Sequence, residues 1–340
     1  MKQVWHVEGD KSNLLSQLEV RDVPEPSPGY GEIKIKVEYA ALCATDVHSI
    51  TQGIMGGRKP PRSIGHEAAG IVVELGPGTE KSDIKVGDKV VFSPKSACGM
   101  CASCKRGKVG RCEKAWGDGA FAEYVIRSAT VTHKIPDDAD LKSYSLVEPT
   151  ACCIRMMDLA SVKHGETVML SGAGGIGLIL LNLIILSGGA KITVSEPSAE
   201  RRDVALSMGA QYVIDPFNED VAKRAKEITN GRGFDHVFEA SGSSHAALPC
   251  TKSIAIDGKI SYFAVYPPTY ELPLNLHDLY MLEGSVQTSR GATILFPRAI
   301  ELIPRMQMEK VIGKIVPLAD ALEAFDLFEK SIYPKVLLKC

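Results

Sequence analysis

The second half of the chain alternates short apolar strands with helical segments, and this alternation limits the fold more than any other feature. A strand that returns through a helix runs parallel to its neighbour, so such a series builds an open parallel sheet covered by helices. Helices are expected near residues 176–187, 199–208 and 219–229. The expected strands are TVMLS (167–171), ITVS (192–195), YVID (212–215), HVFEAS (236–241), ISYFAV (260–265) and SVQTS (285–289). We therefore predict an α/β fold with a doubly wound parallel sheet in a domain at residues 153–290.

The segments on either side of this domain have a different texture. Residues 1–152 are rich in glycine, proline and alternating stretches such as EIKIKVEYAAL (32–42), which is typical of half-buried strands. This texture predicts a mostly β domain of barrel type. Residues 291–340 contain two helical segments and a final strand, KVLLKC (335–340), and we expect them to return to the first domain.

A glycine-rich turn joins the first strand of the doubly wound domain to its first helix. Within GAGGIG, Gly172, Gly174 and Gly177 fit the pattern G-x-G-x-x-G, and the position between strand and helix supports a dinucleotide site. These glycines allow a tight turn, the approach of a pyrophosphate and close packing of helix on strand. The amides of Gly175 and Ile176 open the helix and would bind the phosphates. The motif predicts a Rossmann domain.

An acidic residue follows the next strand. Glu196 stands nineteen residues after Gly177. A carboxylate at this place can accept both ribose hydroxyls and would repel a 2′-phosphate, which favours NAD over NADP. Arg201 lies five residues further on, where it could stack near the adenine or soften that discrimination.

Four of the nine cysteines stand within fifteen positions: Cys98, Cys101, Cys104 and Cys112. In a reducing compartment, clustered cysteines are more often metal ligands than disulfides. Two-residue gaps let backbone amides turn towards the thiolates, as in structural zinc sites with four cysteines. An iron–sulfur cluster and free surface thiols are the alternatives. Because four protein ligands close the coordination sphere, we expect a structural zinc here.

Composition and charge exclude several classes of partner. The formal net charge of −2 gives no electrostatic reason to expect binding to nucleic acid or to an anionic membrane. The N-terminus has no apolar core of signal-peptide length. The longest apolar run, LILLNLIIL (178–186), is too short to span a bilayer. We expect a soluble, cytoplasmic protein.

Two segments of the first domain supply a second set of candidate ligands. CATDVH (43–48) follows a predicted strand, and GHEAAG (65–70) precedes another. Cys43 and His66 are good zinc ligands, and three protein ligands with one open position make a catalytic site. These segments therefore predict a second zinc whose fourth position can bind a substrate.

Six motifs occur in one order along the chain: CATDVH, GHEAAGIVVELG, the four-cysteine cluster, DGAFAEY (118–124), LVEPTACC (146–153) and SGAGGIGL (171–178). Together they resemble the zinc-dependent medium-chain alcohol dehydrogenase family over essentially the whole chain, and LVEP is most similar to the sorbitol and threonine dehydrogenase branch. The resemblance implies a GroES-like catalytic domain, a Rossmann domain and two zincs per subunit. It also implies a homodimer formed through edge strands near residues 285–289, or a homotetramer built from such dimers.

The resemblance also implies the ligands of the catalytic zinc. Cys43 and His66 match two of them, and Glu148 matches the position of the third. Glu67 matches a carboxylate that binds zinc in some family members and stays beside the ligands in others. Asp46 matches the residue that orients the ligand histidine, since a carboxylate fixes the imidazole tautomer.

Cys152 and Cys153 are the competing candidates for the third ligand position. We prefer Glu148 because both cysteines fit an apolar helix that would bury them.

The same resemblance implies a path for the proton released when an alcohol is oxidised. Zinc lowers the pKa of an alcohol bound through its oxygen by several units. Thr45 would take the proton, and His48 would pass it to solvent through the nicotinamide ribose. Arg290 matches an arginine that pairs with the pyrophosphate.

One departure from the family concerns the substrate pocket. Only EKAWGD (113–118) connects Cys112 to GAFAEY, whereas relatives usually have a longer connection that lines the pocket. The short connection predicts a wider mouth or a pocket rebuilt by Trp116.

The expected function is hydride transfer between NAD(H) and a secondary alcohol or ketone, a small molecule such as a polyol, sugar or sugar derivative. Three alternatives remain open: a threonine or simple alcohol dehydrogenase, a zinc-free quinone or enoyl reductase, and a non-enzymatic protein with a relict site.

Overall fold

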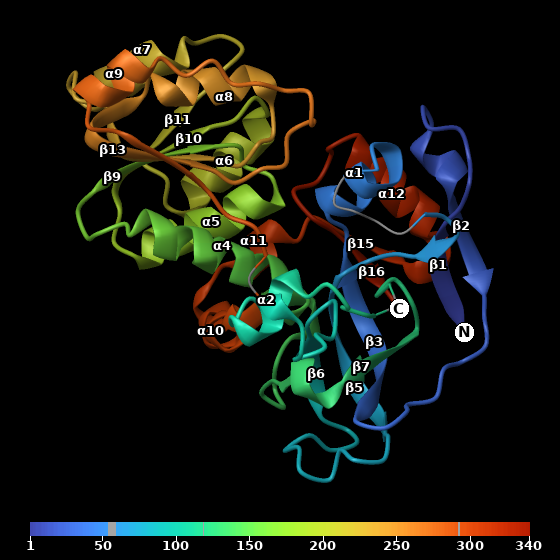
Figure 1. Cartoon of the computed structure of the whole chain (residues 1–340). Helices are drawn as coiled ribbons and strands as arrows, with labels where there is room; N and C mark the ends of the chain where they lie inside the picture. The colour runs from blue at the N-terminus through green and yellow to red at the C-terminus, as the bar shows by residue number, and fades with distance from the viewer. Residues whose placement is uncertain (54–58, 118, 292) are drawn as a thin grey trace. The chain divides into compact units, whose positions relative to one another are not determined.

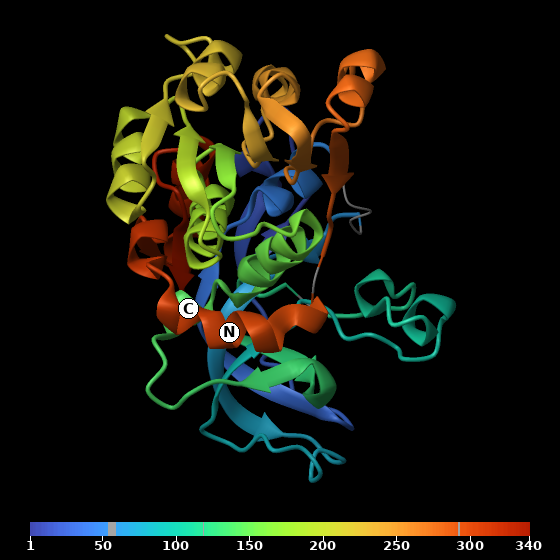
Figure 2. The same ribbon diagram turned by 90° about the vertical axis from the view of Figure 1, so that its left-hand side faces the viewer.

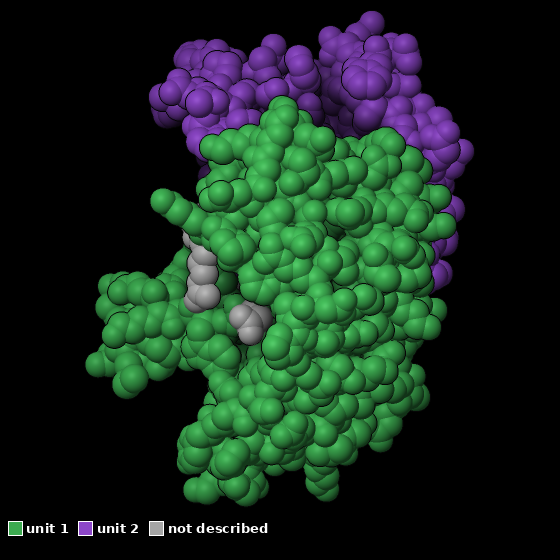
Figure 3. Space-filling model, turned by 90° about the vertical axis from the view of Figure 1, so that its right-hand side faces the viewer, with its two compact units in different colours: residues 1–151, 292–304, 312–340 green, residues 152–291, 305–311 purple. Residues whose placement is uncertain are grey.

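The computed structural model describes residues 1–53, 59–117, 119–291 and 293–340. The chain forms two compact units, which Figure 3 colours separately. Unit 1 contains residues 1–151, 292–304 and 312–340, and unit 2 contains residues 152–291 and 305–311. Unit 1 is mostly β and unit 2 is built on a parallel sheet, which confirms the predicted α/β class.

The main sheet of unit 1 has seven strands drawn from both ends of the chain. At its centre, β3 (Glu32–Ala41) pairs with β5 (Glu67–Leu75) and with the C-terminal strand β16 (Val336–Lys339), as Figure 1 shows. The other strands are β6 (Lys89–Phe92), β7 (Tyr124–Ser128), β8 (Thr132–Lys134) and β15 (Lys314–Pro317). A smaller sheet contains β1 (Lys2–His6), β2 (Leu18–Asp22) and β4 (Arg62–Ser63).

The core of unit 1 lies on one face of β3. Ile33, Ile35 and Val37 alternate along this strand and are completely buried, as the period of two predicts. The ring of Phe121 meets that of Phe325 edge-on, with the ring centroids 5.9 Å apart. The helices of this unit are α1 (Ala44–Thr51), α2 (Ala102–Lys105), α3 (Leu141–Tyr144), α10 (Phe296–Leu302) and α12 (Ala321–Glu329).

The sheet of unit 2 is parallel throughout and has the order β11-β10-β9-β12-β13-β14. From β9 the chain builds outward on one side and then crosses to β12 on the other, so the strand order reverses between β9 and β12. The predicted doubly wound sheet is therefore confirmed. The strands are β9 (Thr167–Ser171), β10 (Ala190–Ser195), β11 (Tyr212–Ile214), β12 (Phe234–Glu239), β13 (Ile254–Tyr262) and β14 (Ser285–Thr288).

Helices connect the strands of unit 2. The apolar run at residues 178–186 lies in α5 (Gly175–Leu186) and is almost entirely buried. Among the described residues, we find no helix with the length and apolar content needed to cross a bilayer. The remaining helices are α6 (Ala199–Met208), α7 (Val221–Ile228), α8 (Ser244–Thr251), α9 (Leu276–Met281) and α11 (Met308–Val311), and α4 (Val147–Ala160) carries the chain from unit 1 into unit 2.

Candidate active site

Three candidate ligands meet where β3 ends and β5 begins. Ala41 of β3 lies opposite Glu67 of β5 in the antiparallel register, so Cys43 and His66 come to the same end of the sheet. The ligand atoms of Cys43, His66 and Glu67 all lie within 4.8 Å of one another. A thiolate, an imidazole and a carboxylate so close together form a donor set that suits zinc.

Asp46 holds the imidazole of His66 in place. Its Oδ1 atom lies 3.0 Å from Nδ1 of His66, which leaves Nε2 as the ring nitrogen available to a metal. Burial disfavours the charged imidazole, but the Asp46 carboxylate and the Cys43 thiolate outweigh it, so the pKa of His66 is raised well above its ordinary value.

A buried lysine that the motifs did not predict lies beside this group. Nζ of Lys335, from the segment that leads into β16, lies 2.6 Å from Oε2 of Glu67. Burial lowers the pKa of Lys335, but Glu67, Cys43 and Glu148 raise it more, so the ammonium form is retained. No local pattern marks this lysine, because β16 pairs with β3 from the opposite end of the chain.

Glu148 and the two neighbouring cysteines lie on α4. The group that meets within 4.8 Å does not include Glu148, although its charge reaches Lys335. Among the described residues, Cys152 and Cys153 also lie outside every such group. Cys153 is buried, with Sγ 3.9 Å from the carbonyl oxygen of Ile176.

Thr45 and His48 follow Cys43 on α1. Their spacing of three residues puts both side chains on one face of that helix. Burial lowers the pKa of His48, so the imidazole is neutral at neutral pH. Nδ1 of His48 is buried and has no hydrogen-bond partner among the described residues.

The four-cysteine cluster forms a lobe that projects from the rest of unit 1, as Figure 2 shows around α2. The sulfur atoms of Cys98, Cys101, Cys104 and Cys112 lie within 4.8 Å of one another. The amide of Cys98 donates to Sγ of Cys112 at 3.3 Å, and the amide of Cys101 donates to Sγ of Cys98 at 3.4 Å. Backbone amides lower the pKa of Cys101 to about 6, so it is readily available as a thiolate.

The short connection after Cys112 runs back along the same lobe. The backbone of Trp116 pairs with that of Ser96 through two hydrogen bonds of 2.8 and 3.2 Å. Trp116 is 36% exposed. The connection predicted to matter for the pocket ends at Asp118, which lies outside the described residues, so its effect stays a prediction.

The glycine-rich turn of unit 2 has the geometry that its motif predicts. Gly172 has φ +98°, and a Cβ added there would lie 2.9 Å from the amide nitrogen of Ser241. A Cβ on Gly177 would lie 2.0 Å from the carbonyl oxygen of Gly172. A Cβ on Gly174, the N-cap of α5, would meet nothing within 4 Å, so this side of the turn is open to a ligand.

Glu196 follows β10 and is held against this turn. Its Oε2 accepts a hydrogen bond of 2.7 Å from the amide of Ala173, and its Oε1 accepts one of 3.1 Å from the amide of Ser198. Arg201 lies in the first turn of α6, and Arg290 is exposed just after β14. The turn, the amides of Gly175 and Ile176 and the Glu196 carboxylate therefore share the carboxyl edge of the parallel sheet, where dinucleotides bind.

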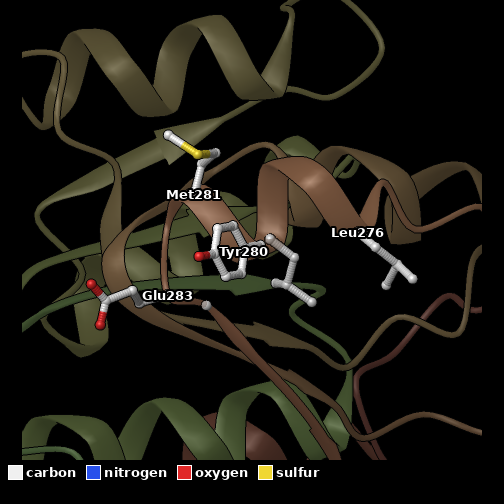
Figure 4. A pocket seen from close by; sticks show the side chains of 6 residues that line it. Leu276, Tyr280, Met281 and Glu283 are labelled. Atoms are coloured by element: carbon white, nitrogen blue, oxygen red, sulfur yellow. The ribbon is translucent and has the colours of Figure 1, made fainter.

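A separate hollow lies on α9 and the turn after it (Figure 4). Leu276, Tyr280 and Met281 line it and are largely exposed, and Glu283 is its one acidic residue. None of the predicted site residues lines this hollow.

Two family models match the chain. The model for the alcohol dehydrogenase GroES-like domain matches residues 29–137, and the model for zinc-binding dehydrogenases matches residues 175–306.

Several curated proteins are similar to the chain. L-threonine 3-dehydrogenase of Pyrococcus abyssi is 38% identical, over 76% of this chain and 75% of its own length. 2-Dehydro-3-deoxy-L-galactonate 5-dehydrogenase of Pseudoalteromonas atlantica is 34% identical, over 88% of each chain. Sorbitol dehydrogenase of Halalkalibacterium halodurans is 32% identical, over 80% of each.

Solved structures share the whole fold. A zinc-binding dehydrogenase from Clostridium scindens superposes with a TM-score of 0.92 and 34% identity, over 100% of this chain and 99% of that one. A zinc-binding dehydrogenase from Sinorhizobium meliloti bound to NADP gives a TM-score of 0.90 and 29% identity, with the same coverage.

Proposed function

Because the chain belongs to the zinc-dependent medium-chain alcohol dehydrogenase family, we propose that it transfers a hydride between NAD and the secondary alcohol of a polyol, sugar or sugar derivative. The motifs predicted this family. Its members are zinc-dependent dehydrogenases, and the protein is therefore one that uses a nicotinamide cofactor. The observation that carries the proposal is the meeting of Cys43, His66 and Glu67 at one end of the sheet.

The proposed catalytic zinc would be held by Cys43 and His66. Bound there, zinc would act as a Lewis acid that lowers the pKa of the alcohol. Glu67 is the carboxylate grouped with these two ligands, and Glu148 is the further ligand that the resemblance implies. Asp46 keeps the His66 imidazole in one tautomer, so its free ring nitrogen is ready for the metal.

The proton of the alcohol would leave along α1. The Thr45 hydroxyl can accept it and, in turn, donate its own proton onward. His48 can receive a proton at neutral pH because burial keeps its imidazole neutral. The shared helix face of these two side chains supports this relay.

The proposed cofactor is NAD rather than NADP. Gly172, Gly174 and Gly177 leave room for the pyrophosphate, and the buried Glu196 carboxylate would repel a 2′-phosphate. Arg201 and Arg290 are proposed contacts to the adenosine and to the pyrophosphate.

Relatives support two substrate classes. Sorbitol and sugar-acid dehydrogenases among them favour a polyol or a sugar derivative. The threonine dehydrogenases, at up to 38% identity, make L-threonine the second candidate. Threonine would require a cationic group that binds its carboxylate, whereas a polyol would require only hydroxyl-binding groups.

Three further expectations belong to the proposal. The four-cysteine lobe would bind a second, structural zinc, because amides directed at its sulfur atoms stabilise thiolates. Such reduced cysteines suit a cytoplasmic location. The strand β14 lies at the edge of its sheet, where two copies could pair into a homodimer, and dimers could pair into a homotetramer.

The decisive experiment combines a substrate screen with metal analysis of one sample. Polyols, sugars, sugar acids and L-threonine are tested with NAD and with NADP, while zinc is counted per chain. We expect two zincs, NAD-dependent turnover of a polyol or sugar derivative, and little with threonine. Turnover of threonine alone would reject the substrate class.

Cysteine variants test the metal centre itself. Cys43→Ser should abolish turnover and leave one zinc per chain, whereas the matched control Cys152→Ser should keep both zincs and the activity. Wild-type activity in Cys43→Ser would remove this cysteine from the mechanism. Zinc counts for Glu67→Gln and Glu148→Gln then show which carboxylate is a ligand.

A further inference from the structure

A buried carboxylate ends β12, one of the two central strands of the parallel sheet. Glu239 ends β12 and has no solvent exposure. Its Oε1 accepts hydrogen bonds from the amide of Ser241, at 2.8 Å, and from the Ser241 hydroxyl. Its Oε2 accepts from the amide of Gly242, at 3.3 Å, and from the hydroxyl of Tyr266. Such donors compensate the cost of burying a charge.

These donors come from two loops at the same edge of the sheet. Residues 240–243 follow β12, and residues 263–266 follow β13. Gly242 has φ +71°, and a Cβ added there would lie 3.4 Å from Cβ of Ala264. From the second loop, the amide of Phe263 donates to the backbone carbonyl oxygen of Glu239 at 2.8 Å, and the Tyr266 hydroxyl donates to the Glu239 carboxylate. The side-chain contact between Glu239 and Tyr266 therefore joins both loops.

The first of these loops also touches the glycine-rich turn. No side chain fits on Gly172, because its Cβ would lie 2.9 Å from the amide nitrogen of Ser241. The contact falls between β9 and β12, where the strand order reverses. Ligands of doubly wound sheets bind in the crevice that opens at this place. The position of Ser241 therefore sets one wall of that crevice.

We propose that Glu239 and Tyr266 are positioning residues for the nicotinamide cofactor, which hold residues 240–243 against Gly172 so that the crevice has its binding width before the cofactor arrives. Preorganisation of this kind improves affinity because less ordering is needed on binding. Burial and the Glu239 carboxylate both raise the pKa of Tyr266, so its phenol remains a donor at any physiological pH. The proposed site of the adenosine half of the cofactor is beside Glu196, at the end of β10. It is therefore separate from residues 240–243, which follow β12.

Tyr266→Phe removes the hydroxyl and keeps the ring, which stacks on Tyr270 with the centroids 5.2 Å apart. Tyr270→Phe is the matched control, because its hydroxyl donates to the carbonyl oxygen of Ser244 and not to Glu239. Dissociation constants for NADH and for AMP are measured by fluorescence and calorimetry on the zinc-loaded enzymes. Amide exchange of residues 240–243 is followed without cofactor.

We expect Tyr266→Phe to weaken NADH binding about tenfold, the size of one charge-assisted hydrogen bond. AMP binding should change less than twofold, and exchange at residues 240–243 should accelerate. Tyr270→Phe should match the unaltered enzyme in all three measurements. Should Tyr266→Phe not fold, Glu239→Gln takes its place with the same expectations.

Unchanged NADH affinity in Tyr266→Phe would overturn the inference, and so would an equal loss of AMP and NADH binding, which indicates general damage. The inference rests on the proposed cofactor, and titration of the unaltered enzyme with NADH and NADPH tests that premise separately.

Discussion

The buried pair of Lys335 and Glu67 offers the sharpest test of how the site is built. The exposed fractions of the two side chains are 4% and 0%, and Nζ lies 2.6 Å from Oε2. Lys335→Met keeps the length and shape of the side chain and removes its charge. The Glu67 carboxylate would then be buried beside Cys43 without the ammonium group that pairs with it, and the His66 imidazole would be the cation left in this group.

The expected loss follows from that geometry. At an effective dielectric constant near 20, two unit charges at this separation attract by about 6 kcal/mol. Desolvation costs several kcal/mol per ion, so the intact pair adds little net stability. Removing one partner leaves the other desolvated and unpaired, at a cost of about 3–5 kcal/mol. With a urea slope near 3 kcal/mol per M, the unfolding midpoint should fall by about 1–2 M.

Tryptophan fluorescence reports the unfolding of unit 1, which contains the Lys335–Glu67 pair. The chain has two tryptophans, Trp5 and Trp116, and both belong to unit 1 with the pair. Urea unfolding is followed after treatment with a chelator, so that no metal charge near Glu67 replaces the lost ammonium. Lys335→Met combined with Glu67→Leu is the control, and it should recover most of the loss because neither charge remains. A midpoint within 0.3 M of the unaltered protein, or about 1 kcal/mol, for the single variant would refute the reasoning.

Three other predictions concern the cofactor, the substrate and pH. Glu196→Ala should shift the ratio of kcat/KM for NAD to kcat/KM for NADP about tenfold or more in favour of NADP, because the carboxylate that repels a 2′-phosphate is lost. An unchanged ratio would mean that Glu196 does not contact the ribose. Trp116→Ala should change KM for the substrate more than KM for the cofactor in steady-state kinetics, and equal changes would place Trp116 away from the substrate. Burial lowers the pKa of His236. Burial raises the pKa of Glu166, but the backbone amide of Lys163 and the His236 side chain lower it more, so the net shift is downward. Both groups release protons on folding, so unit 2 should lose stability as pH falls below about 6.5. In thermal unfolding followed by circular dichroism, His236→Gln should flatten this slope between pH 7 and 5, and an unchanged slope would contradict the assignment.

The features that the sequence predicted are local in the chain. The parallel sheet was visible because each strand and helix carries its own period of apolar residues. The glycine-rich turn could be predicted because each of its three motif glycines is needed for a local conformational reason. Gly172 has a positive φ, and Gly177 lies too close to the Gly172 carbonyl oxygen for a side chain. The cysteine cluster needed only fifteen positions of chain.

Contacts between distant segments could not be predicted in this way. Lys335 reaches Glu67 only because β16 pairs with β3 beside β5, and no spacing in the sequence encodes that neighbourhood. The place of Glu148 relative to Cys43 and His66 likewise depends on how α4 packs. The motif could identify Glu148 as a candidate ligand, but it could not predict whether Glu148 joins the group of Cys43, His66 and Glu67.

The sequence by itself determined which elements form and which side chains have the chemistry for zinc and a dinucleotide, because periodicity, glycine conformation and ligand type are properties of short segments. Only the tertiary structure decided which charges are buried together and which loops touch, as Lys335 does with Glu67 and Ser241 with Gly172. The physical reason is that desolvation and steric fit depend on every group packed around an atom, and most of those groups come from elsewhere in the chain.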